Sequence, residues 1–360
     1  MAEVVVVGAG LAGLTAAICC ARAGHRVLVL ERYARVGGAP EHRPSADSTP
    51  LRPELLGPWL GIGLGPPQVN PTPRGIFHVY GKRYEMEGRR QFMQAVERGP
   101  RNTSLDTYLY ELALREGVRF EFGWALLSQR DAAQLPPGSI VATGLHPEPY
   151  LALGLPFQQV YGSAAHGRLE GPPVAAAWFD TFAGDYCYFA STNGIAFALA
   201  FDRVPLRRDA RSRFAERLLR DLGVELDGWR DFQGAVGAKR LDNPRLFAAG
   251  KILAGSLAGM QDPFFFFGVH ASLISGRIAA MAVDDPAAAW DLFRRISTIY
   301  KYSFAARRLF APLPHAARRP LLRLFFAAVS RRPERYGRLP LQMVPGFREV
   351  QRGQAGSRLR

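Results

Sequence analysis

The chain opens with an apolar run that predicts a strand buried on both faces. Val4–Val7 is continuous rather than alternating, which is typical of a central strand in a parallel sheet. Small and apolar residues then continue at helical spacing as far as Gly24, and a second apolar run, residues 26–30, ends at Glu31. These segments predict a strand–helix–strand unit of about 30 residues.

Further along the chain, the apolar positions switch repeatedly between helical and strand spacing. The expected helices are residues 105–116, 209–222 and 268–281, and the expected strands are 117–122, 139–144 and 246–250. A hairpin is expected over residues 76–87 with its turn near Gly81, and a series of short strands over 156–205. Residues 39–74 are rich in Pro, Gly and polar side chains and are expected to be irregular.

Glycines at the first turn of the N-terminal unit point to its chemistry. Gly8 allows a tight turn, Gly10 lets the backbone approach a pyrophosphate, and Gly13 lets the helix pack closely on the strand. Glu31 stands 18 residues after Gly13, where a carboxylate accepts hydrogen bonds from a ribose diol and repels a 2′-phosphate. The unit predicts a Rossmann-like dinucleotide-binding domain. Since there is one such motif, no separate nicotinamide domain is expected.

The net charge of +15 is concentrated at one end of the chain. Residues 291–360 hold 16 Lys and Arg against three acids, whereas the rest is nearly neutral. Apolar residues such as Phe293, Ile296 and Tyr300 recur within this region at helical spacing. Two interpretations stay open: amphipathic helices on an anionic membrane surface, or a helical cap on the substrate domain. Nucleic-acid binding is not expected, because no recognition motif accompanies the charge.

The three cysteines, Cys19, Cys20 and Cys187, have neither metal-like nor disulfide-like spacing, and no metal site is expected. The chain passes from Met1 into the valine run within three residues, and no apolar run approaches the length of a membrane-spanning helix. We therefore expect a cytoplasmic protein, with peripheral association at the inner face of the membrane if the basic region binds lipid.

Five segments resemble the flavoprotein superfamily of geranylgeranyl reductases, aromatic hydroxylases and halogenases, and the reductases most closely. They are VVVVGAGLAGLTAAICCARAGHRVLVLER with Gly37-Gly38, and residues 101–117, 140–156, 184–200 and 247–280. The resemblance implies an α/β fold in which an FAD-binding domain with a parallel sheet is interleaved with an antiparallel-sheet substrate domain. It assigns residues 1–70, 100–155 and 243–290 to FAD binding, 71–99 and 156–242 to substrate binding, and 291–360 to a basic amphipathic helical C-terminal region.

The resemblance also implies FAD as the cofactor and NAD(P)H as a candidate electron donor. The residues expected to contact FAD are Gly8, Gly10, Leu11, Ala12, Gly13, Glu31, Arg32, Gly37, Gly38, Arg101, Thr143, Gly144, Gly250, Lys251, Gly268 and Val269. Three positions depart from the family pattern. Thr143 and Lys251 each stand where the family has an aspartate, and the segment 262–268 keeps only the last glycine of the usual loop.

Four successive phenylalanines fill that altered loop. The resemblance places the loop beside the flavin, so Phe264, Phe265, Phe266 and Phe267, together with Tyr186, are expected to wall a pocket for an apolar substrate. The alternative is that two or more of the four fill the core. Tyr188 and Cys187 are candidate donors of the proton that accompanies hydride transfer.

The leading hypothesis is an FAD-dependent reductase or dehydrogenase that transfers hydride through flavin N5 on a hydrophobic, isoprenoid- or lipid-like substrate. The second is a flavin-dependent monooxygenase or halogenase acting on an aromatic compound, although the Trp-x-Trp-x-Ile-Pro motif of halogenases is absent. The third is a degenerate, non-redox flavin-binding protein, which the changes at Thr143 and Lys251 suggest.

Overall fold

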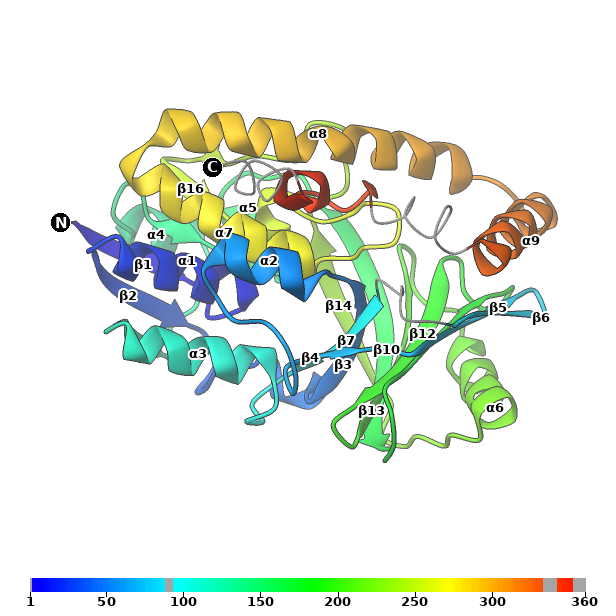
Figure 1. Ribbon diagram of the computed structural model, residues 1–360. Coiled ribbons are helices and arrows are strands. Elements are labelled where there is room, and N and C mark those ends of the chain that lie inside the picture. Colours follow the sequence, from blue (N-terminus) through cyan, green and yellow to red (C-terminus); the bar gives the residue numbers. More distant parts are fainter. Residues whose placement is uncertain (1, 88–92, 333–341, 352–360) are drawn as a thin grey trace.

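The computed structural model describes residues 2–87, 93–332 and 342–351 (Figure 1). One of its three sheets has six strands in the order β15-β16-β9-β1-β2-β8. Their bounds are β1 Glu3–Val7, β2 Arg26–Glu31, β8 Arg119–Phe122, β9 Ile140–Val141, β15 Phe247–Ala248 and β16 Lys251–Leu253. All neighbouring pairs are parallel except β15 with β16. The parallel sheet expected from the valine run is thus confirmed.

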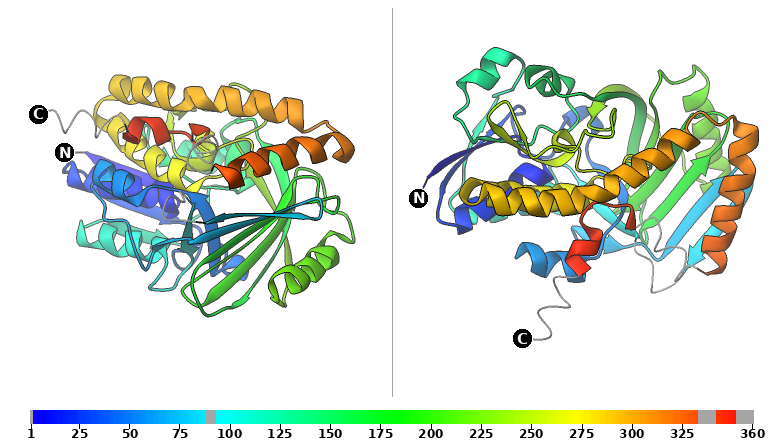
Figure 2. Two further views of the ribbon diagram at one scale, coloured as in Figure 1. Left: turned by 45° about the vertical axis from the view of Figure 1, so that its right-hand side comes forward. Right: turned by 90° about the horizontal axis from the view of Figure 1, so that it is seen from above.

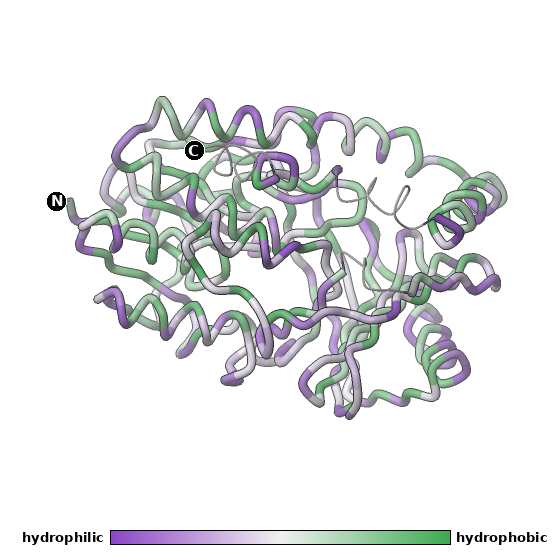
Figure 3. Tube along the Cα trace, in the orientation of Figure 1, coloured by the Kyte–Doolittle hydropathy of each residue, from purple (hydrophilic) through white to green (hydrophobic). Residues whose placement is uncertain are grey.

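Helices cover this sheet. Helix α1 (Leu11–Arg22) packs against α7 (Val269–Asp284) and α3 (Leu105–Arg115). Gly276 makes the first contact close, because a Cβ there would collide with the backbone of α1. The shorter helices are α2 Pro53–Leu60, α4 Gln129–Gln134, α5 Pro147–Ala152 and the 3-10 helices η1 Pro40–His42 and η2 Gly255–Ala258. In Figure 3, β1 and α1 are mostly hydrophobic, whereas hydrophobic and hydrophilic residues alternate along α6 (Ala210–Leu222).

The second sheet has seven strands in the order β14-β10-β13-β12-β11-β5-β6. Their bounds are β5 Arg74–Val79, β6 Lys82–Glu87, β10 Gln158–Arg168, β11 Val174–Phe179, β12 Tyr186–Thr192, β13 Ile195–Asp202 and β14 Arg230–Val236. Alternate side chains, among them Trp178, Cys187 and Phe189, pack with Phe214 of α6 on one face. The other set of side chains lies on the opposite face of the sheet, away from α6. The expected hairpin is confirmed as β5 and β6, with Tyr80 and Gly81 at positive φ in its turn.

A third sheet, β3-β7-β4, takes two of its strands, β3 and β4, from the segment in which the sequence suggested irregular structure. Its strands are β3 Ser45–Pro50, β7 Met93–Arg98 and β4 Val69–Pro71, all antiparallel. The expectation of an irregular segment over 39–74 was wrong, because β3 is polar and pairs with a strand more than 40 residues later, which local periodicity does not reveal. This sheet also joins strands from segments that the sequence assigned to different domains.

Two long helices follow α7. Helix α8 (Pro286–Phe310) packs on α7, and α9 (His315–Arg331) packs on β5 and β6 at the outer end of the seven-stranded sheet (Figure 2). Segment 342–351 then returns, with Val344 and Phe347 against Phe267. The described helices of the basic region therefore form a cap, as the second interpretation expected, whereas residues 333–341 and 352–360 lie outside the described residues. Within the described ranges, no helix is long and apolar enough to cross a membrane.

Candidate functional site

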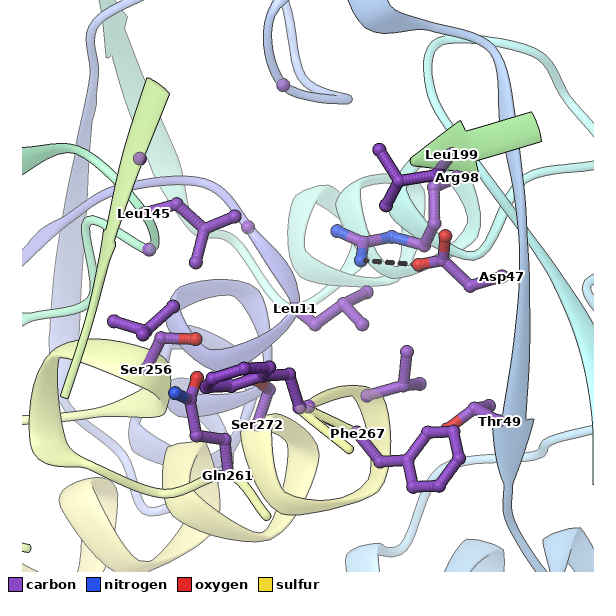
Figure 4. Close-up of a pocket in the computed structure, with 18 of the residues that line it drawn as sticks. Leu11, Asp47, Thr49, Arg98, Leu145, Leu199, Ser256, Gln261, Phe267 and Ser272 are labelled. Carbon is purple, nitrogen blue, oxygen red and sulfur yellow. Dashed lines mark ion pairs between the residues drawn. The ribbon is translucent and has the colours of Figure 1, made fainter. Parts of the chain in front are cut away.

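A cavity of about 820 Å³ is lined by residues of all three sheets (Figure 4). Its walls include the first turn of α1, the inner face of the seven-stranded sheet, the loop before α7, and α9. Figure 4 shows Ser256, Gln261 and Ser272 on one side, and Asp47 and Arg98 on another. The cavity thus combines the N-terminal glycine motif with the predicted substrate region in one space.

The glycine motif forms a cradle that is open toward this cavity. Gly8 has φ +101°, and a Cβ there would lie 2.5 Å from the Ala142 carbonyl oxygen. A Cβ on Gly10, in contrast, would meet nothing within 4 Å. Helix α1 begins at Leu11 without a side-chain cap, so N–H groups of its first turn are left for an anion. Gly10, Leu11 and Ala12 all line the cavity, and Gly13 packs against Gly8 behind them.

Glu31 closes the far side of the cradle. Its carboxylate accepts the N–H of Ala9 at 2.7 Å and the N–H of Tyr33 at 3.0 Å. Burial raises the pKa of Glu31, although these hydrogen bonds oppose the shift. Glu31 and Arg32 both line the cavity, so lone pairs of this carboxylate are available to hydroxyl donors there.

The second segment expected to contact FAD, at Gly250 and Lys251, does not line the cavity, and the residues five positions later do. Lys251 lies in β16, and its Nζ donates to the carbonyl oxygens of Leu135 and Pro136 at 2.7 and 3.2 Å, outside the cavity. Gly250 lies in the turn before it and also does not line the cavity. Gly255 and Ser256 line it instead. The sequence analysis expected a strand over residues 246–250 and none after it, whereas β16 (Lys251–Leu253) is the strand that pairs with β9.

Two further expected contacts are also corrected. The Arg101 guanidinium donates to the Asn193 carbonyl at 3.0 Å and lies 3.3 Å from Glu97, outside the cavity. Gly37 packs against Gly99, while its neighbour Gly38 does line the cavity. Besides the expected Arg32, the cavity is lined by Arg43 and Arg98, which sequence reasoning missed. Nothing in their local pattern distinguishes them from the chain's many other arginines.

Arg98 organises a polar cluster at this end of the cavity. It makes two bonds to Asp106, of 2.8 and 2.9 Å, and lies 3.7 Å from Asp47. Burial alone would raise the pKa of Asp106, but the Arg98 guanidinium holds it below its usual value. Arg43 is half-buried and donates to the Gly37 carbonyl and the Ser45 hydroxyl. The cluster is therefore internally paired.

The candidate proton donors separate according to the pleat of β12. Tyr186 and Tyr188 line the cavity, whereas Cys187 points to the opposite face, where it is buried against the α6 side. Cys187 therefore cannot reach a substrate in the cavity. The Tyr188 hydroxyl donates to Asp47 at 3.3 Å, and burial raises its pKa well above the usual value. The Tyr186 hydroxyl is committed to the Phe265 carbonyl.

The phenylalanine loop contributes three of its four side chains to the cavity wall, so the alternative in which two or more fill the core is not met. Phe265, Phe266 and Phe267 line the cavity. Phe264 does not; its half-buried ring packs against Phe310. The loop is held by Asp262, whose carboxylate accepts the N–H groups of Phe264 at 3.1 Å and Phe265 at 2.7 Å and the hydroxyl of Ser303.

Three buried polar atoms in the cavity wall have no hydrogen-bond partner among the described residues. They are Oγ1 of Thr49, Oγ1 of Thr143 and Nε2 of Gln261. Gly144, Gly268 and Val269 also line the wall. Because buried polar groups are nearly always paired in native proteins, such atoms indicate a polar ligand.

Comparisons with known proteins agree with this arrangement at the N-terminus. A family model described as FAD dependent oxidoreductase matches residues 3–43. The flavin-containing monooxygenase FMO GS-OX2 of Arabidopsis thaliana is 56% identical over 49 residues, which are 14% of this chain. The matched segment spans only 11% of that relative's length. These likenesses concern the dinucleotide motif and do not define a reaction.

Solved structures extend the likeness to the fold of nearly the whole chain. A geranylgeranyl bacteriochlorophyll reductase-like protein of Thermoplasma acidophilum has a TM-score of 0.68 at 14% identity, covering 88% of this chain and 89% of that one. CtdE, solved with FAD and a substrate, has a TM-score of 0.60 at 16% identity, covering 85% and 87%. Both identities are below 20%, so these structures show that the chain shares their fold, while the family model places an FAD-dependent oxidoreductase motif at residues 3–43. FAD is therefore the cofactor to compare with the residues of the site.

The residues of this site fit FAD. The uncapped start of α1 and the open space over Gly10 suit a pyrophosphate, and Glu31 suits a ribose. Ser256, Gln261 and Thr143 offer neutral donors and acceptors to the remaining polar groups. Because Lys251 lies outside the cavity, no reversed charge faces the cofactor at the second motif.

His270, one residue beyond the cavity wall, makes stability depend on pH. It is buried beside Phe347, and burial lowers its pKa to about 4. The unfolded chain therefore binds a proton on the His270 imidazole more readily than the folded chain does. The contribution of the buried, neutral imidazole to stability is complete above about pH 6.5 and is lost as the pH falls toward 4. We expect His270→Leu to remove up to about 3 kcal/mol of this pH dependence, measured as urea unfolding at several pH values. An unchanged slope would contradict the assignment.

Proposed function

We propose that the protein is an FAD-dependent reductase or dehydrogenase of an apolar, isoprenoid- or lipid-like substrate. The observation that carries the proposal is the wall of the cavity beyond the FAD motifs. Its apolar members include Phe77, Ala164, Ala175, Ala177, Phe179, Phe197, Leu199, Phe201, Phe265, Phe266, Phe267, Phe325 and Phe326. Such a wall favours an apolar ligand through the hydrophobic effect and dispersion contacts.

When bound, FAD supplies hydride transfer at its N5, with NAD(P)H as the proposed electron donor. The chain's own residues would bind and orient the substrate, exclude water and deliver one proton. Tyr188 is the candidate for that last role, because it lines the cavity and a tyrosine carries its hydroxyl proton at neutral pH. In the structure this proton is donated to Asp47, so its delivery to a substrate requires the hydroxyl to turn away from that carboxylate.

Filling the apolar wall should separate substrate binding from cofactor binding. Ala177 on β11 pairs with Phe77 on one side and Tyr188 on the other, and all three line the cavity. We expect Ala177→Trp to leave FAD content unchanged and to lower turnover of an apolar substrate roughly tenfold or more, since overpacking costs about 1–3 kcal/mol. The matched control is Ala287→Trp, at an exposed position near the start of α8.

The assay begins with the absorption spectrum of the purified protein and identification of released flavin. Reduced protein is then mixed anaerobically with a polyprenyl lipid that carries isolated double bonds, and reoxidation of the flavin is followed. Reoxidation with formation of the saturated lipid supports the proposal. Turnover that requires dioxygen and hydroxylates or halogenates an aromatic compound would favour the second hypothesis. Protein that fails to retain FAD would favour the non-redox alternative.

A further inference from the structure

Helix α9 is apolar on two opposite faces. Its inner face buries Leu322, Phe326 and Val329 against the seven-stranded sheet, and the last two line the cavity. The helix is fixed in this position by Arg323, which donates to backbone carbonyls of Val79 and Tyr80. Arg318 similarly donates to the carbonyls of Gly184 and Ala311.

The outer face of α9 carries a second apolar stripe. Ala317, Leu321, Leu324 and Ala328 follow one another at spacings of four, three and four residues, which places them on one side of the helix. Leu321 is 52% exposed and Leu324 is 73% exposed. Single exposed leucines need no explanation, but a stripe with helical spacing on an already packed helix does.

The charge around this stripe is of one sign. Between residues 292 and 332 there are ten Lys and Arg and no Asp or Glu. Lys301, Arg308, Arg319, Arg331 and Arg332 are exposed. Helix α8 adds exposed Tyr302 and Leu309, and its C-terminal half meets α9 at an outer corner of the molecule (Figures 1 and 2).

We propose that the outer face of α9 docks on an anionic membrane surface. Leucines at the centre of a cationic helix face suit insertion at headgroup depth, where the arginines meet lipid phosphates. The charge favours lipid over a second copy of this chain, because two such faces would bring like charges together. The proposal needs only this surface and does not depend on the reaction.

Docking of this kind deepens the proposed function. Phe325 lines the cavity and is only half-buried, so it lies between the apolar space inside and the stripe outside. A membrane against α9 would bring a lipid-like substrate next to the cavity without crossing water. This route for the substrate rests on the proposed function, whereas the docking itself is measured without any substrate.

The experiment compares binding of the full chain to two kinds of vesicle, phosphatidylcholine alone and phosphatidylcholine with phosphatidylglycerol, by flotation. We expect binding to the anionic vesicles only, weakened by raised salt because the charges are exposed. Leu321→Ser/Leu324→Ser should reduce this binding roughly tenfold or more, since each substitution removes apolar area from the contact with the bilayer. Both side chains are exposed, so the fold should tolerate the change.

The matched control is Leu151→Ser/Leu219→Ser, which removes two leucines of 64% and 53% exposure on α5 and α6. It should bind as the wild type does. Equal binding by Leu321→Ser/Leu324→Ser and wild type would overturn the proposal, as would no binding of the wild type to anionic vesicles. A dimer in size-exclusion chromatography that the α9 variant converts to a monomer would instead assign this face to a second copy.

Discussion

Replacing Gly10 with aspartate is expected to abolish tight FAD binding while leaving the fold intact. The backbone at Gly10, with φ −87° and ψ −176°, suits any residue, and a Cβ there meets nothing within 4 Å. Aspartate is also a favourable N-cap, worth about 1 kcal/mol to an uncapped helix. The same carboxylate would occupy the N–H groups at the start of α1 and repel a pyrophosphate. We expect FAD affinity to fall on the order of 100-fold or more, which is about 3 kcal/mol.

The measurement is a fluorescence titration of the apoprotein with FAD, beside a thermal unfolding curve of the apoprotein. Gly65→Asp is the matched control, because a Cβ there also meets nothing within 4 Å and Gly65 lies outside the cavity. It should change neither quantity. Wild-type affinity in Gly10→Asp would mean that the start of α1 is not the pyrophosphate site. A lowered melting temperature would show that the variant acts through folding.

This prediction bears on the non-redox alternative. That hypothesis rested on Thr143 and on the positive charge of Lys251. The structure removes the second argument, since Lys251 is bonded to backbone carbonyls outside the cavity and Ser256 stands at the wall. Thr143 retains a buried, unpartnered hydroxyl that can bond to a polar ligand. The loss of a carboxylate at this position therefore leaves a neutral polar contact rather than a gap.

Features with a local sequence signal were predicted correctly. The valine run, the glycines and Glu31 lie within about 30 residues, and each element there is specified by its own period or turn. The hairpin at Tyr80-Gly81 was equally predictable, because its turn and both strands are contiguous in the sequence. Helix ends differed from expectation by only a few residues.

Features decided by long-range pairing were not predictable in this way. Which of β15 and β16 is the parallel strand depends on β9, more than 100 residues earlier, and that choice moved the second motif from Gly250 to Gly255. The same applies to Arg98, whose partner Asp106 and neighbour Asp47 meet only in the folded chain. Cys187 could have been excluded beforehand, since period-two alternation puts it opposite Tyr186 and Tyr188.

Removing the partner of Asp106 is expected to cause the largest loss of stability. Asp106 is 1% exposed and is bonded to Arg98 through both carboxylate oxygens, with one further bond from the Gly99 N–H. Arg98→Met would leave this carboxylate buried without its bonded counter-charge, with only the weaker attraction of Arg43 remaining, which costs up to about 3–5 kcal/mol in comparable cases. The free energy of unfolding in urea measures the effect. The exposed pair Arg240–Asp242 is the control, and Arg240→Met should cost about 1 kcal/mol or less.

The double variant Arg98→Met/Asp106→Leu distinguishes an unpaired charge from lost packing. Apolar replacements of a whole buried pair are often neutral or stabilising, so we expect the double variant to recover most of what Arg98→Met loses. The low pKa of Asp106 adds a second signature, because a depressed carboxyl stabilises the fold above its unfolded pKa and that contribution is lost as the pH falls. The double variant should lack this acid sensitivity. If it were instead as unstable as Arg98→Met at every pH, Arg98 would be holding the cavity wall through Asp47 and its packing, and the pair itself would contribute little.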